Sequence, residues 1–115
     1  MSEDNFKYSL YEKGSLHVIL VEESRLNGTN APLFKTELLR IITGGAKNLV
    51  INVKNVESID SSGLGAITFG NRQMEESGGK ISLCCLSDKV STLFKIAKLD
   101  RVFDIFDSEE DAQSK

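Results

Sequence analysis

The spacing of hydrophobic and polar residues changes several times along the chain, and each spacing predicts one kind of element. Residues 6–12 alternate between the two classes, which is typical of a half-buried strand. Residues 16–21 are almost continuously apolar and rich in β-branched side chains, so we expect a second, more buried strand after a short turn. Three further short apolar runs predict buried strands at 49–53, 81–86 and 102–106.

The segments between the later strands carry apolar residues at helical spacing. A first helix is predicted after Asn30, a favourable N-cap, with Pro32 in its first turn. A second helix is predicted from Ser62 to Ser77, and a third begins at a cap formed by Ser87 or Asp88. The expected inward faces are Phe34, Leu38, Ile41 and Ile42 in the first helix, Leu64, Ile67, Asn71 and Met74 in the second, and Val90, Leu93, Phe94 and Ala97 in the third.

The predicted order of elements is β-β-α-β-α-β-α-β. Strands separated by single helices become parallel neighbours through right-handed crossovers, whereas the first two strands, only a turn apart, favour an antiparallel hairpin. We therefore expect one α/β domain over residues 1–115, with helices packed on a mixed sheet of four to five strands and a core at about 6–107. Residues 108–115 predict a polar C-terminal tail, which is either a last helical turn or a frayed end.

Composition limits the classes of function. A net charge of −3 gives no electrostatic footprint for nucleic acid or for an anionic membrane. The N-terminus does not resemble a signal peptide, and no apolar run approaches the length of a membrane span, so we expect a cytoplasmic protein without membrane insertion. Cys84 and Cys85 are adjacent, and a disulfide between neighbours is strained, so we expect two reduced thiols on opposite faces of one strand.

The candidate chemistry lies in the run Asp60-Ser61-Ser62-Gly63, followed at one residue's distance by Gly65. The run joins a strand to a helix, where open α/β sheets usually place a functional site. A helix N-terminus offers unpaired N–H groups and a partial positive charge, so it tolerates a phosphate, and glycines let another protein approach the hydroxyls. Ser and Asp are also good N-caps, so the same run could be a cap and nothing more.

The segment Ile59-Asp60-Ser61-Ser62-Gly63-Leu64-Gly65 resembles the STAS domain of bacterial anti-sigma-factor antagonists. The preceding strand at 49–53, the following Glu76-Ser77-Gly78-Gly79-Lys80, and the later stretch Val90 to Leu99 with Val102-Phe103 resemble the same domain, so the similarity covers nearly the whole chain. The resemblance implies binding to an anti-sigma factor that is also a serine kinase, which releases a sigma factor. It implies that the kinase phosphorylates the serine directly after the aspartate, Ser61, and that a metal-dependent serine phosphatase reverses this.

In such a cycle the chain is ligand and substrate, not catalyst, and it needs no cofactor or metal of its own. Ser24 and Asn27 stand where family members commonly carry a Gly and an Asp, in the loop after the second strand. We take Asn27 as a candidate partner contact for that reason. Phe69 and Arg72 are further candidates because they lie off the inward face of the second helix, although a large aromatic such as Phe69 is more often part of the core.

Other chemistries fit the residues less well. A hydrolase elbow of the Gly-x-Ser-x-Gly type would need a glycine where Ile59 stands, and His17, the only histidine, is predicted to be a buried structural residue. Gly63-x-Gly65 lacks both the dinucleotide fingerprint and a phosphate-loop lysine. The remaining alternative is a STAS module that is never phosphorylated, a scaffold of a sensory complex or an accessory subunit of a transporter, in which Ser61 and Ser62 would only be caps.

Overall fold

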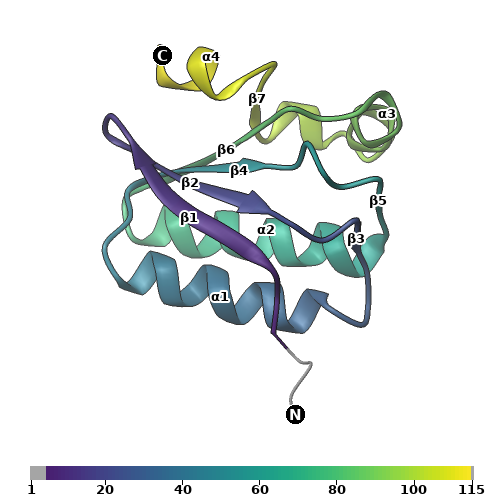
Figure 1. Cartoon of the computed structure of the whole chain (residues 1–115), viewed down its shortest axis with the longest axis horizontal. Helices are drawn as coiled ribbons and strands as arrows, with labels where there is room; N and C mark the ends of the chain where they lie inside the picture. Colours follow the sequence, from purple (N-terminus) through teal and green to yellow (C-terminus); the bar gives the residue numbers. More distant parts are fainter. Residues whose placement is uncertain (1–4, 115) are drawn as a thin grey trace.

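The computed structural model describes residues 5–114, and its centre is a five-stranded mixed sheet (Figure 1). In spatial order the strands are β1 (Tyr8–Lys13), β2 (Leu16–Val21), β4 (Asn48–Asn52), β6 (Lys80–Cys84) and β7 (Asp104–Phe106). β1 and β2 form the expected antiparallel hairpin, and every other pair of neighbours is parallel. The prediction of a mixed α/β sheet with helical crossovers is confirmed.

Two short strands that the hydrophobic pattern does not predict form a second, two-stranded sheet. β3 (Arg25–Leu26) runs parallel to β5 (Ser58–Ile59), with Leu26 opposite Ile59. Two residues are too few to show an alternation of period two, so the sequence carries no signal for either strand. Since β5 leads directly into helix α2, this small sheet determines where that helix begins.

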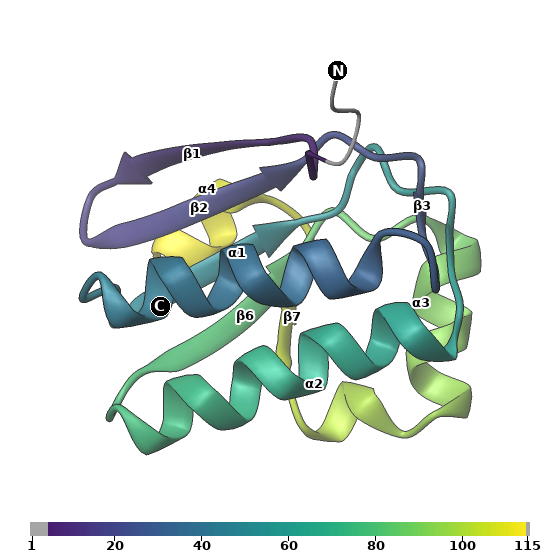
Figure 2. The ribbon, with the colours of Figure 1, turned by 90° about the horizontal axis from the view of Figure 1, so that it is seen from below.

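Helices α1 (Ala31–Thr43) and α2 (Ser61–Glu76) lie side by side on one face of the sheet (Figures 1 and 2). The predicted inward residues of α1 are all buried: Phe34, Leu38, Ile41 and Ile42. The ring of Phe6 stacks on that of Phe34, with 4.6 Å between centroids, and ties the start of the chain to this core. Burial of each large apolar side chain contributes roughly 1.5–3 kcal/mol, so the packing of α1 on the sheet stabilises the fold substantially.

The inward face of α2 is only partly the predicted one. Ile67 and Met74 are buried as expected, but Asn71 is half-buried, and Gly70 faces the core instead. A Cβ added at Gly70 would lie 3.0 Å from Cδ1 of Leu38, which is closer than ordinary packing allows. The glycine therefore lets α2 approach α1 closely, and the helix is rotated slightly from the face that side-chain hydrophobicity indicates.

Helix α3 (Asp88–Ile96) and the short 3₁₀ turn η1 (Leu99–Arg101) connect β6 to β7, and α3 lies beside β5. Ser87 caps α3 as predicted, because its Oγ accepts a hydrogen bond from the backbone N–H of Val90 at 3.2 Å. Ala97, predicted to face inward, is exposed because the helix ends before it. None of the helices within residues 5–114 is both long and apolar enough to cross a membrane.

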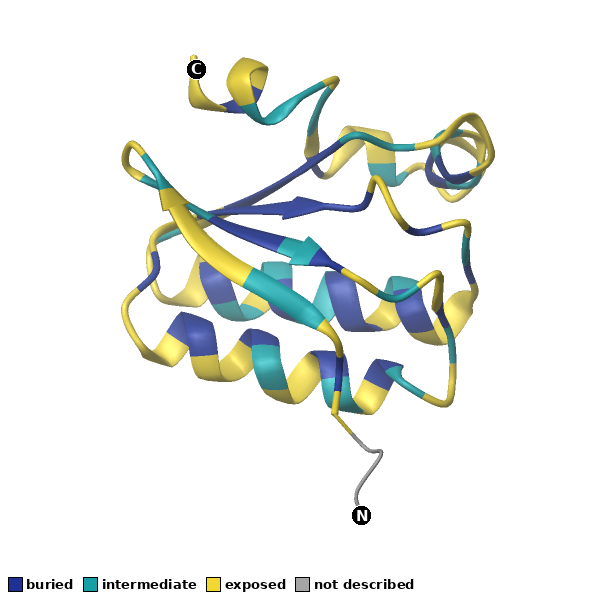
Figure 3. Cartoon of the chain, in the orientation of Figure 1, coloured by how far each residue is buried: buried dark blue, intermediate teal, exposed yellow. Residues whose placement is uncertain are grey.

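The chain ends in a short helix, α4 (Glu109–Gln113), on the opposite face of the sheet from α1 and α2 (Figures 1 and 3). Of the two alternatives for this polar stretch, the helical turn is the one observed, and Ser108 caps it by accepting from the N–H of Asp111 at 3.1 Å. Ala112 is buried against Val18, Val50 and Cys84. The stretch thus covers part of the sheet.

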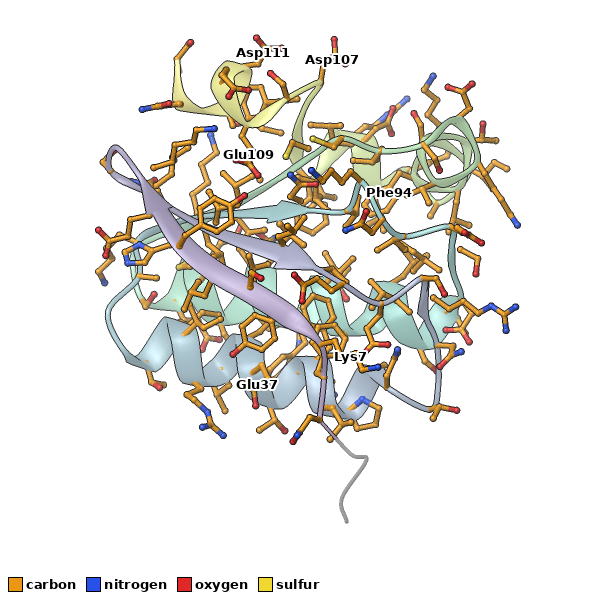
Figure 4. The ribbon with its side chains drawn as sticks, viewed as in Figure 1. Lys7, Glu37, Phe94, Asp107, Glu109 and Asp111 are labelled. Carbon is orange, nitrogen blue, oxygen red and sulfur yellow. The ribbon has the colours of Figure 1, made fainter. Side chains whose placement is uncertain are left out.

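Glu109 fastens α4 to the sheet, toward which its side chain points (Figure 4). Its carboxylate accepts hydrogen bonds from the hydroxyl of Tyr11 at 2.5 Å, the amide of Asn52 at 2.6 Å and the ammonium of Lys13 at 3.2 Å. Burial and the bond to Glu109 raise the pKa of Tyr11 to about 12. Burial alone would raise the pKa of Glu109, but the hydrogen bonds from its three donors outweigh it and lower that pKa.

Candidate functional site

Ser61 is the first residue of α2, and Asp60 is the N-cap before it. Asp60 has an extended backbone, and its Oδ1 accepts a hydrogen bond from the N–H of Gly63 at 3.0 Å. Asp60 therefore supplies the side-chain capping oxygen, and Ser61 and Ser62 do not. Ser61 and Ser62 are both exposed, and within residues 5–114 neither hydroxyl makes a hydrogen bond.

The small β3–β5 sheet holds this helix start in place. The N–H of Asp60 donates to the carbonyl of Leu26 at 3.0 Å, and the N–H of Glu57 donates to the carbonyl of Ser24 at 2.7 Å. A Cβ added at Gly63 would lie 2.7 Å from the Leu26 carbonyl oxygen, so only glycine fits there. Gly63 is therefore required by packing inside the domain and does not open the surface to a partner.

Gly65 differs from Gly63 in this respect. A Cβ added at Gly65 would meet no atom within 4 Å, and the residue is exposed. It leaves open space one turn from Ser61 and Ser62. Of the two glycines in the motif, Gly65 is the one whose missing side chain leaves room for another molecule.

The loop after β2 adjoins the helix start. A Cβ placed on Gly28 would lie 3.6 Å from Oγ of Ser62. Asn27 is half-buried, and its Oδ1 accepts from the backbone N–H of Thr29 at 3.0 Å, while its own N–H donates to Oδ1 of Asn30 at 3.0 Å. The side chain of Asn27 therefore shapes the loop. Asn30 occupies the predicted N-cap position of α1, but its side chain serves the same loop and not the helix.

A groove runs from this loop along α1 and α2. Its first part, of about 310 Å³, includes Ser62 and Gly65 on one side and Pro32 and Lys35 on the other. A second part, of about 320 Å³, adds Phe69, whose ring lies 4.9 Å from the ammonium of Lys35. The full set of lining residues is Gly28, Ala31, Pro32, Lys35, Thr36, Leu39, Ser62, Gly65, Ala66 and Phe69.

Phe69, whose place in the core or on the surface was left open, is half-buried in the wall of this groove. Arg72, one turn further along α2, is exposed. On the other side of Ser61, an apolar hollow of about 250 Å³ lies between β5 and α3, and Ile96 on its rim is 74% exposed. Sequence reasoning missed this hollow, although Ile96 falls off the predicted inward face of α3, which is the signal that could have indicated it.

The backbone N–H groups at the start of α2, beside the Asp60 carboxylate, can accept an anion as a hydrogen-bond partner. The first turn contains no acidic side chain after the Asp60 cap. The N–H groups of Ser61 and Ser62 precede the first carbonyl-paired N–H of the helix, that of Leu64, and within residues 5–114 they have no hydrogen-bond partner. Such N–H groups and the helix dipole stabilise a phosphate group placed there.

Two other candidates lie away from this site. His17, expected to be buried, is half-exposed on β2, with Nε2 3.5 Å from Oε2 of Glu12. Cys85 is not on the opposite face of a strand from Cys84, because β6 ends at Cys84 and the two sulfur atoms lie 3.3 Å apart. Over residues 5–114 no group of three or more His, Cys, Asp and Glu side chains is arranged to hold a metal ion.

Known proteins resemble this chain in sequence and in fold. A Thermotoga maritima protein, provisionally named an anti-sigma factor antagonist, is 32% identical over 99 residues, which are 85% of this chain and 88% of that protein. Its crystal structure superposes with a TM-score of 0.81 over 95% of this chain and 92% of that one. The anti-sigma-B factor antagonist of Bacillus subtilis is 33% identical over 66% of this chain and 69% of its own length.

SpoIIAA, named in its solved structures as an anti-sigma factor antagonist and a Bacillus cell fate determinant, shares the fold at 21% identity. The TM-score is 0.70 for its unphosphorylated form, over 94% of this chain and 96% of that one. The TM-score is 0.71 for the phosphorylated form of SpoIIAA, over 94% of this chain and 97% of that one. The family model of the STAS domain matches residues 8–112, which is nearly all of the described structure. The chain belongs to the STAS domain family.

Proposed function

We propose that this chain is an anti-sigma factor antagonist that binds an anti-sigma factor with serine kinase activity and is released from it when Ser61 is phosphorylated. A serine phosphatase would restore the binding form. The observation that supports the proposal most is the position of Ser61, exposed at the first residue of α2 directly after the Asp60 cap. The relatives named as anti-sigma factor antagonists support the partner class.

Each residue near Ser61 has a proposed part in this cycle. Ser61 supplies the acceptor oxygen, while the partner supplies ATP and magnesium. Asp60 fixes the helix start and Gly63 permits its close packing on β3. Ser62 and Gly65 border the groove, Phe69 lies in its wall, and the exposed Arg72 extends the proposed partner surface along α2. Asn27 contributes to partner binding by shaping the loop after β2, because its hydrogen bonds lie within that loop.

Electrostatics give the switch sufficient strength without a rearrangement of the domain. A phosphate adds about 1.5 to 2 negative charges. At about 4–5 Å from a partner carboxylate, with an effective dielectric constant near 20, each added charge costs roughly 3–4 kcal/mol before screening. A loss of about 4 kcal/mol is roughly a thousandfold in affinity, enough to dissociate a micromolar complex. The helix N-terminus meanwhile stabilises the phosphate in the free protein.

The alternative is a STAS scaffold that is never phosphorylated. This alternative assumes that Ser61 and Ser62 serve only as helix caps. The side-chain cap of α2 comes from Asp60, and both serine hydroxyls are exposed. The cap explanation therefore accounts for Asp60 but leaves the two serines without a structural role, which favours the switch.

Phosphate mapping on the protein isolated from its source cell tests the proposal. We expect an intact mass raised by one phosphate in part of the population, with the phosphate on Ser61. The Ser61→Ala protein, used as bait in the same extract, should retain an ATP-binding protein and a Ser61→Asp bait should not. Absence of phosphate under every growth condition, with equal retention by both baits, would favour the scaffold.

A further inference from the structure

The two neighbouring cysteines place their sulfur atoms side by side. In a continuing strand they would point to opposite faces of the sheet. Here Cys85 follows the end of β6 and has a φ of 66°, in the left-handed region that residues with a side chain seldom adopt. This turn of the backbone brings both side chains to one side, where the Cys85 thiol donates to the Cys84 sulfur at 3.3 Å.

The surroundings hold Cys85 in this strained conformation. Its backbone N–H donates to the carbonyl of Phe106 at 3.1 Å, and the carbonyl of Cys84 accepts from the N–H of Val53 at 3.2 Å. Strain of this kind persists only where the neighbouring structure imposes it, and it is common at functional sites.

The two thiols differ in access. Cys84 is fully buried beneath α4, among Val18, Val50 and Ala112, and this burial raises the pKa of its thiol. Cys85 is partly exposed. Cys85 can therefore be reached by a solute from water. Cys84 is shielded from water, and its sulfur already contacts the sulfur of Cys85. This is the arrangement of a thiol that reacts with a peroxide and a resolving thiol beside it.

We propose that Cys84 and Cys85 form a redox modification site at which a peroxide produces a reversible disulfide between the two. The Cys85 sulfur attacks one peroxide oxygen, the O–O bond breaks, and Cys85 becomes a sulfenic acid with release of one water. The Cys84 sulfur then attacks the Cys85 sulfur, the S–O bond breaks, and the hydroxyl leaves with the Cys84 proton as a second water. Two thiols thus lose two electrons and two protons to one hydrogen peroxide.

The product is suited to a transient role. The α-carbons of neighbours joined by a trans peptide are about 3.8 Å apart, below the usual disulfide range of about 4.4–6.8 Å. The resulting strain makes the bond easily reduced by a cellular dithiol. This modification is separate from the proposed phosphorylation, because the cysteines lie under α4 and Ser61 lies at the start of α2.

Intact-mass measurement of the full chain after treatment with hydrogen peroxide tests the site. We expect both thiols to disappear together, with a mass lower by two hydrogens, a peptide map that joins Cys84 to Cys85 within one chain, and full recovery with dithiothreitol. A mass raised by one or more oxygens, or a dimer on a non-reducing gel, without the loss of two hydrogens would overturn the proposal.

Single-thiol variants separate the two roles. Cys85→Ser should leave Cys84 reduced over the same period, because peroxide cannot reach it. Cys84→Ala should leave a sulfenic acid on Cys85 that a dimedone probe captures. Equal oxidation of Cys84 in the Cys85→Ser protein, with circular dichroism unchanged, would also overturn the proposal.

Discussion

The carboxylate of Asp60 accepts a hydrogen bond from the N–H of Gly63 at 3.0 Å, so the residue before Ser61 closes the first turn of α2. In the sequence, this aspartate could be a cap or part of the functional motif. In the structure it is the cap, and by capping the helix it leaves the next two hydroxyls exposed. The structural role of Asp60 and the proposed role of Ser61 are therefore complementary.

Removal of the cap should destabilise the domain. Asp60→Ala should lower the free energy of unfolding by about 0.5–2 kcal/mol, the usual cost of losing an N-cap. Asp60→Asn keeps a capping oxygen and should lower the free energy of unfolding by only a few tenths of a kcal/mol. Urea denaturation of the three proteins measures the difference. If the Asn variant lost as much stability as the Ala variant, the charge and not the hydrogen bond would be the stabilising element.

The two glycines of the motif should respond in opposite ways to alanine. Gly63→Ala forces a Cβ to within 2.7 Å of the Leu26 carbonyl oxygen and should cost roughly 1–3 kcal/mol, as overpacking does. Gly65→Ala meets open space within a helix and should stabilise the fold by about 0.5–1 kcal/mol. Thermal denaturation distinguishes them, and a stable Gly63→Ala protein would contradict the close packing of α2 on β3.

Stability should fall in acid because of Glu109. Its pKa is lowered in the folded state from a usual value of 4.5, so the unfolded chain binds the proton first. The contribution of Glu109 is present above pH 4.5 and is lost as the pH falls through its lower folded pKa. Glu109→Gln should flatten the decline of the denaturation midpoint with pH. Glu110→Gln is the comparison. The hydrogen bond from Lys13 also lowers the pKa of Glu110, but Glu110 is exposed and an exposed pair contributes little, so this variant should flatten the decline much less.

The fold could be predicted from the sequence wherever an apolar pattern was long enough to show its period, as in α1 with Phe34 and Leu38. It could not be predicted where packing decides. Gly70 faces the core because only a residue without a side chain lets α2 pack so closely on Leu38 of α1, and no hydrophobicity scale indicates a buried glycine there. The left-handed turn at Cys85 likewise depends on its hydrogen bond to Phe106 of β7, which is distant in the sequence.

The candidate site could be predicted only where its residues are neighbours in the sequence. The motif identified Asp60 and Ser61 because they are contiguous. The groove beyond them is formed by residues of two helices that meet only in the fold, such as Lys35 and Phe69. Its position depends on the β3–β5 sheet, which no pattern predicted.

Phe69 should contribute more to partner binding than to folding. It is half-buried in the groove wall, so Phe69→Ala should lower the free energy of unfolding by only about 1 kcal/mol. An aromatic anchor at an interface commonly contributes about 2 kcal/mol or more, so binding to the anti-sigma factor should weaken about thirtyfold. Calorimetric titration and thermal denaturation measure the two effects. Phe34→Ala, in the core, should instead lose about 3–5 kcal/mol of stability.

Ser61, and not Ser62, should be the phosphoacceptor. Both hydroxyls are exposed, so exposure alone does not distinguish the two serines. They differ in position, because Ser61 directly follows the Asp60 cap, whereas Ser62 borders the groove beside Gly28. Ser61→Ala should abolish phosphorylation and keep partner binding. Ser61→Asp should weaken binding by the repulsion of one added charge while the domain stays folded, because an acidic residue in the first turn of a helix is favourable. Ser62→Ala should neither abolish phosphorylation nor weaken partner binding.

Kinase assays with phosphate mapping measure the phosphorylation of each variant, and titrations with the partner measure its binding. A phosphate mapped to Ser62, or normal phosphorylation of the Ser61→Ala protein, would show that the assignment is wrong.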